Sequence, residues 1–179
     1  MKKIFGRLDT TDLIKQITIV ALFMALGVTL QRPLDIHVGT FHIFSATIIA
    51  SFLMVSFTDW RVSLLGSMTM ITLGELIVTQ HDDFWTNYLP MFVAILLVHI
   101  FKLFKSFWIS IIGIIIAIVQ FELLKAFIVY LSYGLARGYA QTLGAFIQIG
   151  TSTLVVLMIY SSLYKVVKMM NTSIYSYNK

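Results

Sequence analysis

The chain has 179 residues, of which 59% are hydrophobic and 12% are charged, and its mean hydropathy is +0.90. Soluble domains carry about 25% charged residues, so this composition excludes an ordinary soluble domain and indicates an integral membrane protein. The net charge of +5 suits the inner surface of a membrane, where anionic headgroups attract basic residues, and it does not imply nucleic-acid binding. The absence of cysteine excludes disulfides and thiolate chemistry.

Six apolar stretches follow one another along the chain. Each approaches or exceeds the roughly 20 residues that a helix needs to cross about 30 Å of hydrocarbon. They run over residues 13–31, 42–58, 61–79, 87–105, 107–133 and 140–164. A short lead, residues 1–11, precedes them, and a tail, residues 165–179, follows. The sequence therefore predicts an all-α membrane protein whose residues 1–179 form a single six-helix domain.

The basic residues predict how these helices are oriented. With the N-terminus inside, only Arg32 and Arg137 fall on the outer side and Lys125 lies within the fifth stretch, while the other basic residues face the cytoplasm. Basic residues resist translocation, so both termini are expected to be cytoplasmic.

The outer connections, residues 31–42, 80–88 and 133–139, are longer than the inner ones. Pro33 is expected to end the first helix, because proline lacks the backbone N–H that continues a helix. Trp85 and Tyr88 lie near a predicted helix end, where aromatic rings favour the membrane interface.

A few polar side chains interrupt the apolar stretches. Charged side chains inside hydrocarbon cost roughly 2.5–3.5 kcal/mol each on insertion scales, so they indicate functional positions. The candidates are Glu75 in the third stretch, Glu122 and Lys125 in the fifth, and Gln148 in the sixth. All fall in the outer half of their helices, which predicts a polar pocket that opens to the outside.

Glu122 and Lys125 are neighbours on one helix face. They either neutralise one another to lower the cost of insertion, or they contact a ligand, and the sequence leaves both interpretations open. A row of side chains, Glu122, Ala126 and Tyr130, leads from the carboxylate toward the outer mouth. His99 lies near the inner end of the fourth stretch, where a hydrogen bond between helices is expected rather than a site.

Enzyme signatures are missing from the sequence. There is no Gly-Xaa-Ser-Xaa-Gly elbow, no His-Glu-Xaa-Xaa-His motif and no glycine-rich phosphate loop. Histidines and aspartates in the outer loops are explained by surface polarity. We therefore expect no catalytic residue, no metal and no cofactor, and any energy that the protein uses has to come from a gradient or from a partner.

The first stretch contains Ala21-Leu22-Phe23-Met24-Ala25, which places two small side chains on one helix face and permits close contact with another helix. With the chain length, the six helices and the outer polar groups, this pattern resembles the S components of the energy-coupling factor (ECF) vitamin transporters. The resemblance implies a multi-pass protein of the bacterial plasma membrane. It also implies that Ala21 and Ala25 contact a membrane T component, and that two ATP-binding-cassette ATPases complete the complex.

In that family the vitamin is captured outside, between the outer ends of helices four to six and the loops after helices one, three and five, and the S component is thought to topple to release it. Lys125 and Arg137 suit a carboxylate such as pantothenate, whereas Glu75 or Glu122 suits an amino-pyrimidine or a hydroxylated pyridine. The full set of candidate ligand contacts is Glu75, Trp85, Tyr88, Glu122, Lys125, Tyr130, Arg137 and Gln148.

Two other functions remain open from the sequence. The first is a six-helix scaffold of the cell-wall elongation machinery, resembling the rod-shape protein MreD, which needs no ligand pocket. The second is a small proton-coupled carrier with Glu75 or Glu122 as its proton site.

Overall fold

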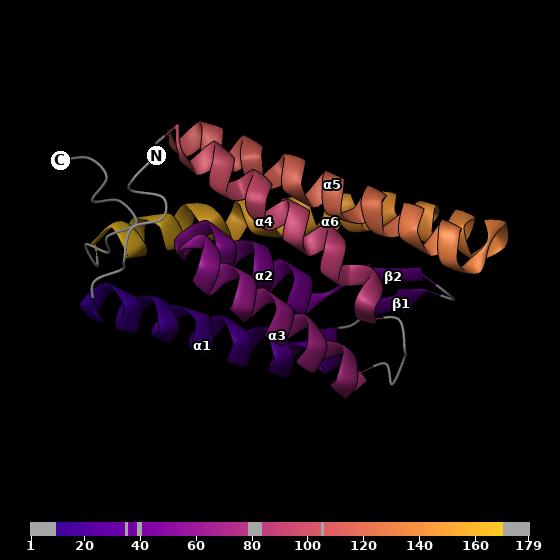
Figure 1. Cartoon of the computed structure of the whole chain (residues 1–179), viewed down its shortest axis with the longest axis horizontal. Helices are drawn as coiled ribbons and strands as arrows, with labels where there is room; N and C mark the ends of the chain where they lie inside the picture. The colour runs from indigo at the N-terminus through magenta and orange to yellow at the C-terminus, as the bar shows by residue number, and fades with distance from the viewer. Residues whose placement is uncertain (1–9, 35, 39–40, 79–83, 105, 170–179) are drawn as a thin grey trace.

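The computed structural model describes residues 10–34, 36–38, 41–78, 84–104 and 106–169, which form six α-helices, a β-hairpin and one short 3-10 helix (Figure 1). The elements in chain order are α1 (Thr10–Leu34), β1 (Ile36–Val38), β2 (Phe41–Phe44), α2 (Ala46–Phe57), α3 (Trp60–Val78), η1 (Phe84–Asn87), α4 (Tyr88–Lys102), α5 (Phe107–Tyr133) and α6 (Leu135–Met169).

Successive helices run in opposite directions, so their connections alternate between two ends of the bundle (Figure 1). We call one end the hairpin end, because it holds β1, β2 and the junction of α5 with α6. The other is the turn end, which holds the short connections from α2 to α3 and from α4 to α5. Helix α1 begins and helix α6 ends at the turn end.

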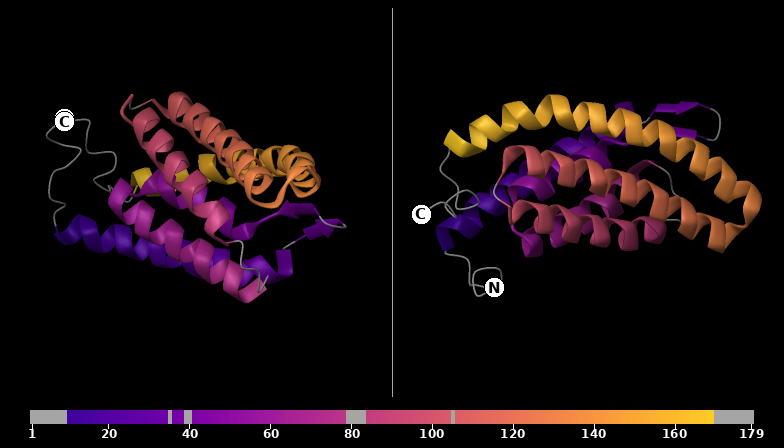
Figure 2. Two further views of the ribbon diagram at one scale, coloured as in Figure 1. Left: turned by 45° about the vertical axis from the view of Figure 1, so that its right-hand side comes forward. Right: turned by 90° about the horizontal axis from the view of Figure 1, so that it is seen from above.

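The helices form two groups. Helices α1, α2 and α3 all pack against one another, whereas α4 and α6 each pack on α5. Helix α2 joins the groups, since it also contacts α4, α5 and α6, and β2 packs on α6 (Figure 2).

Helix α2 is the core of the bundle, and all 12 of its residues are buried. At about 1.5 Å per residue it is roughly 18 Å long, which is shorter than the hydrocarbon layer. Its neighbours approach it closely through glycines. A Cβ atom on Gly27 of α1 would lie 2.9 Å from Ala50 Cβ, and one on Gly74 of α3 would collide with Thr47. Glycine at these positions therefore lets α1 and α3 close on α2.

A buried helix leaves backbone groups at its ends that need partners. At the hairpin end of α2 the partner is Gln31 of α1, which is itself buried. Its Oε1 atom accepts hydrogen bonds from the Thr47 backbone N–H at 2.8 Å, from the Thr47 hydroxyl at 3.1 Å and from the Ser45 hydroxyl at 3.3 Å. The end of α1 thus caps the beginning of α2.

At the turn end, α4 supplies the partners. Lys102 Nζ donates to the carbonyl oxygens of Val55 and Thr58, each at 2.9 Å. His99 Nε2 lies 3.1 Å from the same Thr58 oxygen, which confirms the predicted hydrogen bond between helices. A lysine ammonium at the end of α2 also suits the partial negative charge of a helix C-terminus.

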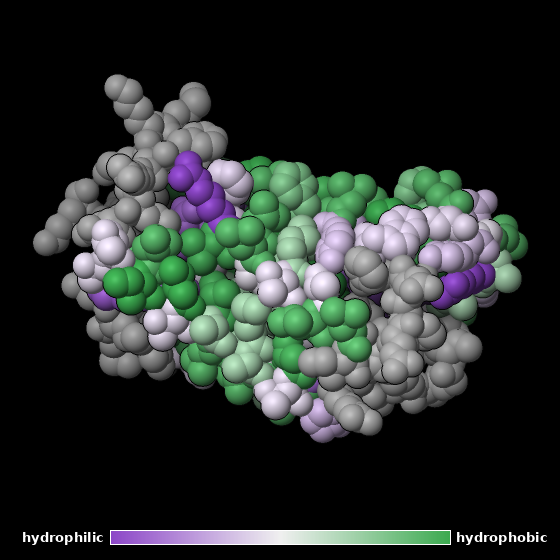
Figure 3. All heavy atoms as spheres, turned by 60° about the horizontal axis from the view of Figure 1, so that its bottom comes forward, coloured by the Kyte–Doolittle hydropathy of each residue, from purple (hydrophilic) through white to green (hydrophobic). Residues whose placement is uncertain are grey.

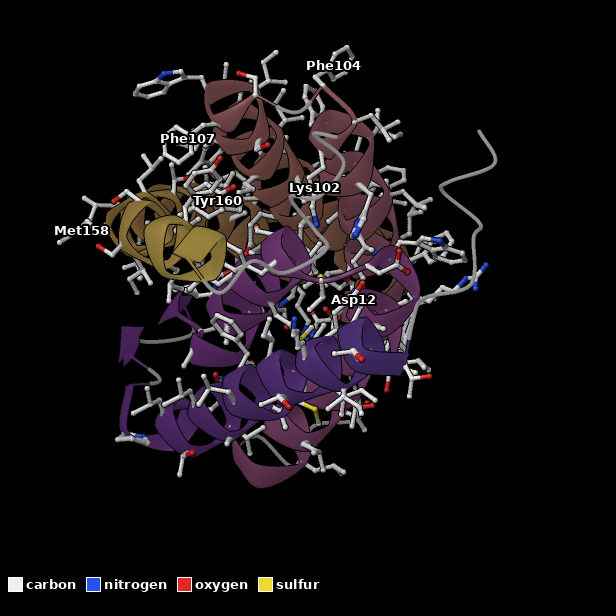
Figure 4. The ribbon with its side chains drawn as sticks, turned by 90° about the vertical axis from the view of Figure 1, so that its left-hand side faces the viewer. Asp12, Lys102, Phe104, Phe107, Met158 and Tyr160 are labelled. Carbon is white, nitrogen blue, oxygen red and sulfur yellow. The ribbon has the colours of Figure 1, made fainter. Side chains whose placement is uncertain are left out.

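The same end holds a stack of aromatic rings that ties four helices together. Phe57 of α2 stacks on Phe23 of α1, with ring centroids 6.5 Å apart, and on Tyr160 of α6, at 5.3 Å. Phe107 of α5 stacks on Tyr160 at 5.7 Å and meets Tyr164 edge-on at 4.7 Å. Figure 4 looks at this end, with Phe107 and Tyr160 beside each other and Lys102 between α4 and the end of α2.

The hairpin corrects one prediction. Residues 42–44 were expected to begin the second helix, but they belong to β2, which pairs antiparallel with β1 through Val38 and Phe41. The segment alternates apolar and polar residues around Gly39, a pattern typical of a hairpin. The structure is therefore helical apart from this hairpin.

Two predicted helix ends are also wrong. Pro33 lies inside α1, which ends one residue later, so the missing N–H removes only a bond of the last turn. The sixth helix begins at Leu135 rather than at residue 140. Gly134, with φ of +86°, makes the whole turn from α5, because glycine tolerates a positive φ.

Four of the described helices are long and apolar enough to cross a membrane: Thr10–Gln31, Trp85–Lys102, Phe107–Tyr133 and Leu135–Tyr164. Their outward side chains are largely leucine, isoleucine and phenylalanine. Figure 3 shows apolar residues over much of one face, with the most hydrophilic described residues near its two ends. These features indicate a membrane protein.

Candidate functional site

The hairpin-end halves of α5 and α6 enclose a shallow groove of about 310 Å³. Its lining includes Leu123, Ala126, Phe127 and Tyr130 of α5 and Gly138 and Thr142 of α6. A Cβ atom on Gly138 would lie 2.6 Å from Tyr130 Cβ, so only glycine lets the first turn of α6 approach α5 this closely. The groove places Tyr130, a predicted ligand contact, beside Tyr139.

Glu122 lies one helical turn inward from Ala126 on the same row of α5. Its side chain is only 1% exposed, and its Oε2 atom has no hydrogen-bond partner in the part of the chain that the structure describes. An ionised carboxylate is rarely buried without a partner, because it loses its hydration. Glu122 shares this feature with Gln120 of the same helix, whose two amide atoms also lack a partner among the described residues.

Lys125 acts on Glu122 electrostatically but does not bond Oε2. It is half-buried, whereas Glu122 points into the core. Glu122 and Lys125 are therefore neighbouring charges on α5 that make no contact through Oε2. On α6, Gln148 is buried with 3% exposure at a similar distance from the hairpin end.

The remaining candidates are more dispersed. Glu75 belongs to α3, and its side chain lies outside the described residues. Trp85 of η1 is exposed. Tyr88, at the start of α4, bonds Thr72 of α3 through the two hydroxyls at 2.6 Å, so it links these helices.

Arg137 lies in the first turn of α6 and is exposed. Its guanidinium lies over the ring of Tyr133, with Cζ 4.2 Å from the centroid, a cation–π arrangement. This cation is therefore at the surface of the hairpin end rather than beside the buried Glu122.

Ala21 and Ala25 are both exposed on the outer face of α1, on the side away from α2 and α3. Thr18 and Thr29 extend this face, and their hydroxyls bond the carbonyls of Ile14 and Ala25 within the helix. The face therefore presents two alanines and two satisfied hydroxyls among larger exposed side chains such as Leu22 and Leu26, and the alanines allow close approach of another membrane helix.

Sequence reasoning missed the polar caps of α2. Gln16 accepts the Asp59 N–H at 2.7 Å, as Gln31 accepts the Thr47 N–H at the other end of α2. The sequence signal for these caps was a pair of glutamines that lie about four turns apart in an apolar helix. It also missed the apolar lining of the groove, for which Gly138 was the only local sign.

Among the residues that the structure describes, no group of three or more metal-ligating side chains comes together. Comparison of the chain with family models, with curated proteins and with solved structures finds no match. The functional argument therefore depends on the geometry of the chain itself.

Proposed function

We propose that this chain is the substrate-binding S component of an ECF-type importer in a bacterial plasma membrane. It captures a vitamin or vitamin precursor outside and delivers it inward together with a T component and two ATPases. In this proposal the hairpin end faces outward, all six helices lie in the membrane, and both termini are cytoplasmic.

The observation that carries the proposal is the exposed pair of alanines on α1. Ala21 and Ala25 lie on the outside of the bundle, where a lipid-facing helix needs no small side chains. Without a hydrophobic driving force between helices in lipid, small residues favour association because they allow close van der Waals contact. A partner helix from a T component fits this face.

The hairpin end supports capture of a ligand from outside. It combines the groove between α5 and α6 with the buried carboxylate of Glu122 one turn below. A purely structural scaffold resembling MreD has no use for a buried carboxylate with an unpaired oxygen, and this observation favours the binding subunit.

The turn end supports a partner as the source of energy. Phe57, Phe107 and Tyr160 stack across the bundle there and fill the space between α2, α5 and α6. A proton-coupled carrier moves its substrate between helices of one chain, which requires this stack to separate. A subunit that reorients as a whole keeps its packing intact.

A photocrosslinking amino acid placed at Ala25 tests the proposal in the native membrane. We expect light-dependent crosslinks from position 25 to a membrane protein that copurifies with ATP-binding subunits. The matched control position is Leu154 of α6, which is 58% exposed on the opposite group of helices and is expected to crosslink only to lipid. Crosslinks from both positions alike, or from neither, would contradict the assignment of the α1 face.

A further inference from the structure

We propose that the groove between α5 and α6 holds one acyl chain of an anionic phospholipid, whose phosphate is bound by Arg137 at the hairpin end. This inference goes beyond the proposed function, because the occupant comes from the bilayer and is not the imported molecule. A lipid in this position closes the bilayer side of the hairpin end. The inference holds for either orientation of the bundle in the membrane.

The groove opens on the outside of the bundle. Two of its lining residues, Ala126 of α5 and Gly138 of α6, are small and buried and form its floor. Exposed side chains stand on both sides of this floor, among them Phe127 and Tyr130 of α5 and Leu135 of α6. Both helices are long and apolar enough to cross a membrane, so this surface faces acyl chains.

The lining suits a hydrocarbon chain. It is made largely of leucine, phenylalanine and tyrosine side chains, and the hydroxyl of Thr142 already donates to the Gly138 carbonyl oxygen at 2.8 Å. Along α5 the groove reaches from Leu123 to Tyr130, which is roughly 10 Å at 1.5 Å per residue. An acyl chain in such a groove gains van der Waals contact, which is what drives association within lipid.

A cation lies at the hairpin end of the groove. Arg137 directly precedes Gly138, which packs so closely that a Cβ atom on it would lie 2.6 Å from Tyr130 Cβ. The Arg137 guanidinium stacks on Tyr133, which follows Tyr130 by three residues and is its neighbour on the surface of α5. The positive charge therefore lies about one helical turn beyond the lining of the groove.

This charge suits a phosphate in the headgroup layer. Stacking on a ring uses the face of a guanidinium, whereas its N–H donors lie in its plane, in the geometry that binds phosphate. Helix α5 ends at Tyr133, so Arg137 is placed where membrane helices meet the interface. Glu122, the only acidic residue of α5 and α6, is buried in the core and leaves the charge at this surface positive.

Native mass spectrometry of the purified full-length chain tests the inference with two lipids. Dioleoyl phosphatidylglycerol is anionic, and dioleoyl phosphatidylcholine has the same acyl chains and no net charge. We expect one phosphatidylglycerol molecule to bind about fivefold more tightly, which corresponds to the roughly 1 kcal/mol that one basic residue contributes near anionic headgroups. Equal affinity for the two lipids would overturn the inference.

Arg137→Gln should remove this preference, because it removes the charge and leaves the groove intact. The matched control is Arg61→Gln. Arg61 is also an exposed arginine over a ring, with Cζ 5.5 Å from the Trp60 centroid, but it lies in α3 at the turn end. The preference should persist in this control. A preference that survives Arg137→Gln, or that both variants lose alike, would contradict the assigned phosphate contact.

A second measurement locates the acyl chain on the unaltered protein. Phosphatidylglycerol with a photoactivatable diazirine on one acyl chain is crosslinked to the full chain, and the modified peptides are identified by their masses. We expect attachment mainly within residues 123–130 and 135–142. Attachment spread evenly over all the lipid-facing helices would overturn the inference.

Other occupants of the groove are tested by a photocrosslinking amino acid at Phe127 in the native membrane. We expect it to capture lipid. Capture of a protein, whether a second copy of this chain or a partner, would assign the groove to that occupant and overturn the inference. These results are independent of partner crosslinking at Ala25, which tests the proposed function.

Discussion

Single side chains from other helices form hydrogen bonds with the free backbone groups at the two ends of α2, the most buried helix. Gln31 caps the beginning of α2, and Lys102 and His99 cap its end. Each reaches across from another helix, so the caps also fix the register of α1 and α4 against α2. In a membrane these contacts matter because no water replaces a lost backbone partner.

Lys102→Met tests this role at the scale of one residue. The change keeps most of the side-chain volume and removes a donor to two carbonyl oxygens, so we expect a loss of about 1.5–3 kcal/mol in the free energy of unfolding. Lys15→Met is the control, because Lys15 lies near the beginning of α1 and is half-buried. Thermal unfolding in detergent measures the stability of both variants. Equal melting temperatures would show that the hydrogen bonds from Lys102 to the Val55 and Thr58 carbonyl oxygens do not stabilise the protein.

The α-helices correspond to long apolar stretches of the sequence, so this part of the fold was predictable. Helix α5 has the predicted bounds of 107–133, and the other helices fall within or near their predicted stretches. The hairpin and the early start of α6 were not predicted. Apolar residues of β2 were assigned to the second helix, and the start of α6 depends on the turn at Gly134 rather than on hydropathy.

Of the candidate site, the sequence singles out Glu122 because it interrupts an apolar helix, and the structure buries its side chain in the core. The separation of Glu122 from Arg137 could not be predicted from the sequence, because it depends on the direction that α6 takes after the turn at Gly134. The groove was also hidden, since apolar side chains facing lipid and those lining a groove look alike in a sequence.

The close approach of the first turn of α6 to α5 depends on Gly138. Gly138→Ala should lower the melting temperature, because its new Cβ atom would lie 2.6 Å from Tyr130 Cβ and push the helices apart. Gly150→Ala on the same helix is the matched control, with nothing within 4 Å of the new atom. It should stabilise the protein by up to about 1 kcal/mol through helix propensity. Equal shifts of the same sign would contradict the close packing at Gly138.

At the scale of the whole molecule, the two ends of the helix bundle differ in chemistry. The hairpin end carries the groove and the buried carboxylate, and the turn end carries the lysine cap and the aromatic stack. This polarity suits a protein that receives a small molecule on one side of a membrane and depends on partners to release it on the other.

Cysteine labelling tests the orientation directly, because the chain contains no cysteine of its own. A membrane-impermeant maleimide should label Leu135→Cys, at the hairpin end, in intact cells. Leu103→Cys, at the turn end, should be labelled only after the membrane is permeabilised. Both positions are exposed on the bundle, so the reverse pattern would show that the hairpin end faces the cytoplasm.

We propose that this chain works as one subunit of an ATP-driven importer. The intact mass of the complex purified through this chain in a mild detergent, measured together with its ATPase activity, tests this directly. We predict an assembly of the 20.3 kDa chain with one membrane partner and two ATP-binding subunits, and ATP hydrolysis by that assembly. Recovery of the chain alone, or with cell-wall synthesis proteins and no ATPase, would contradict it.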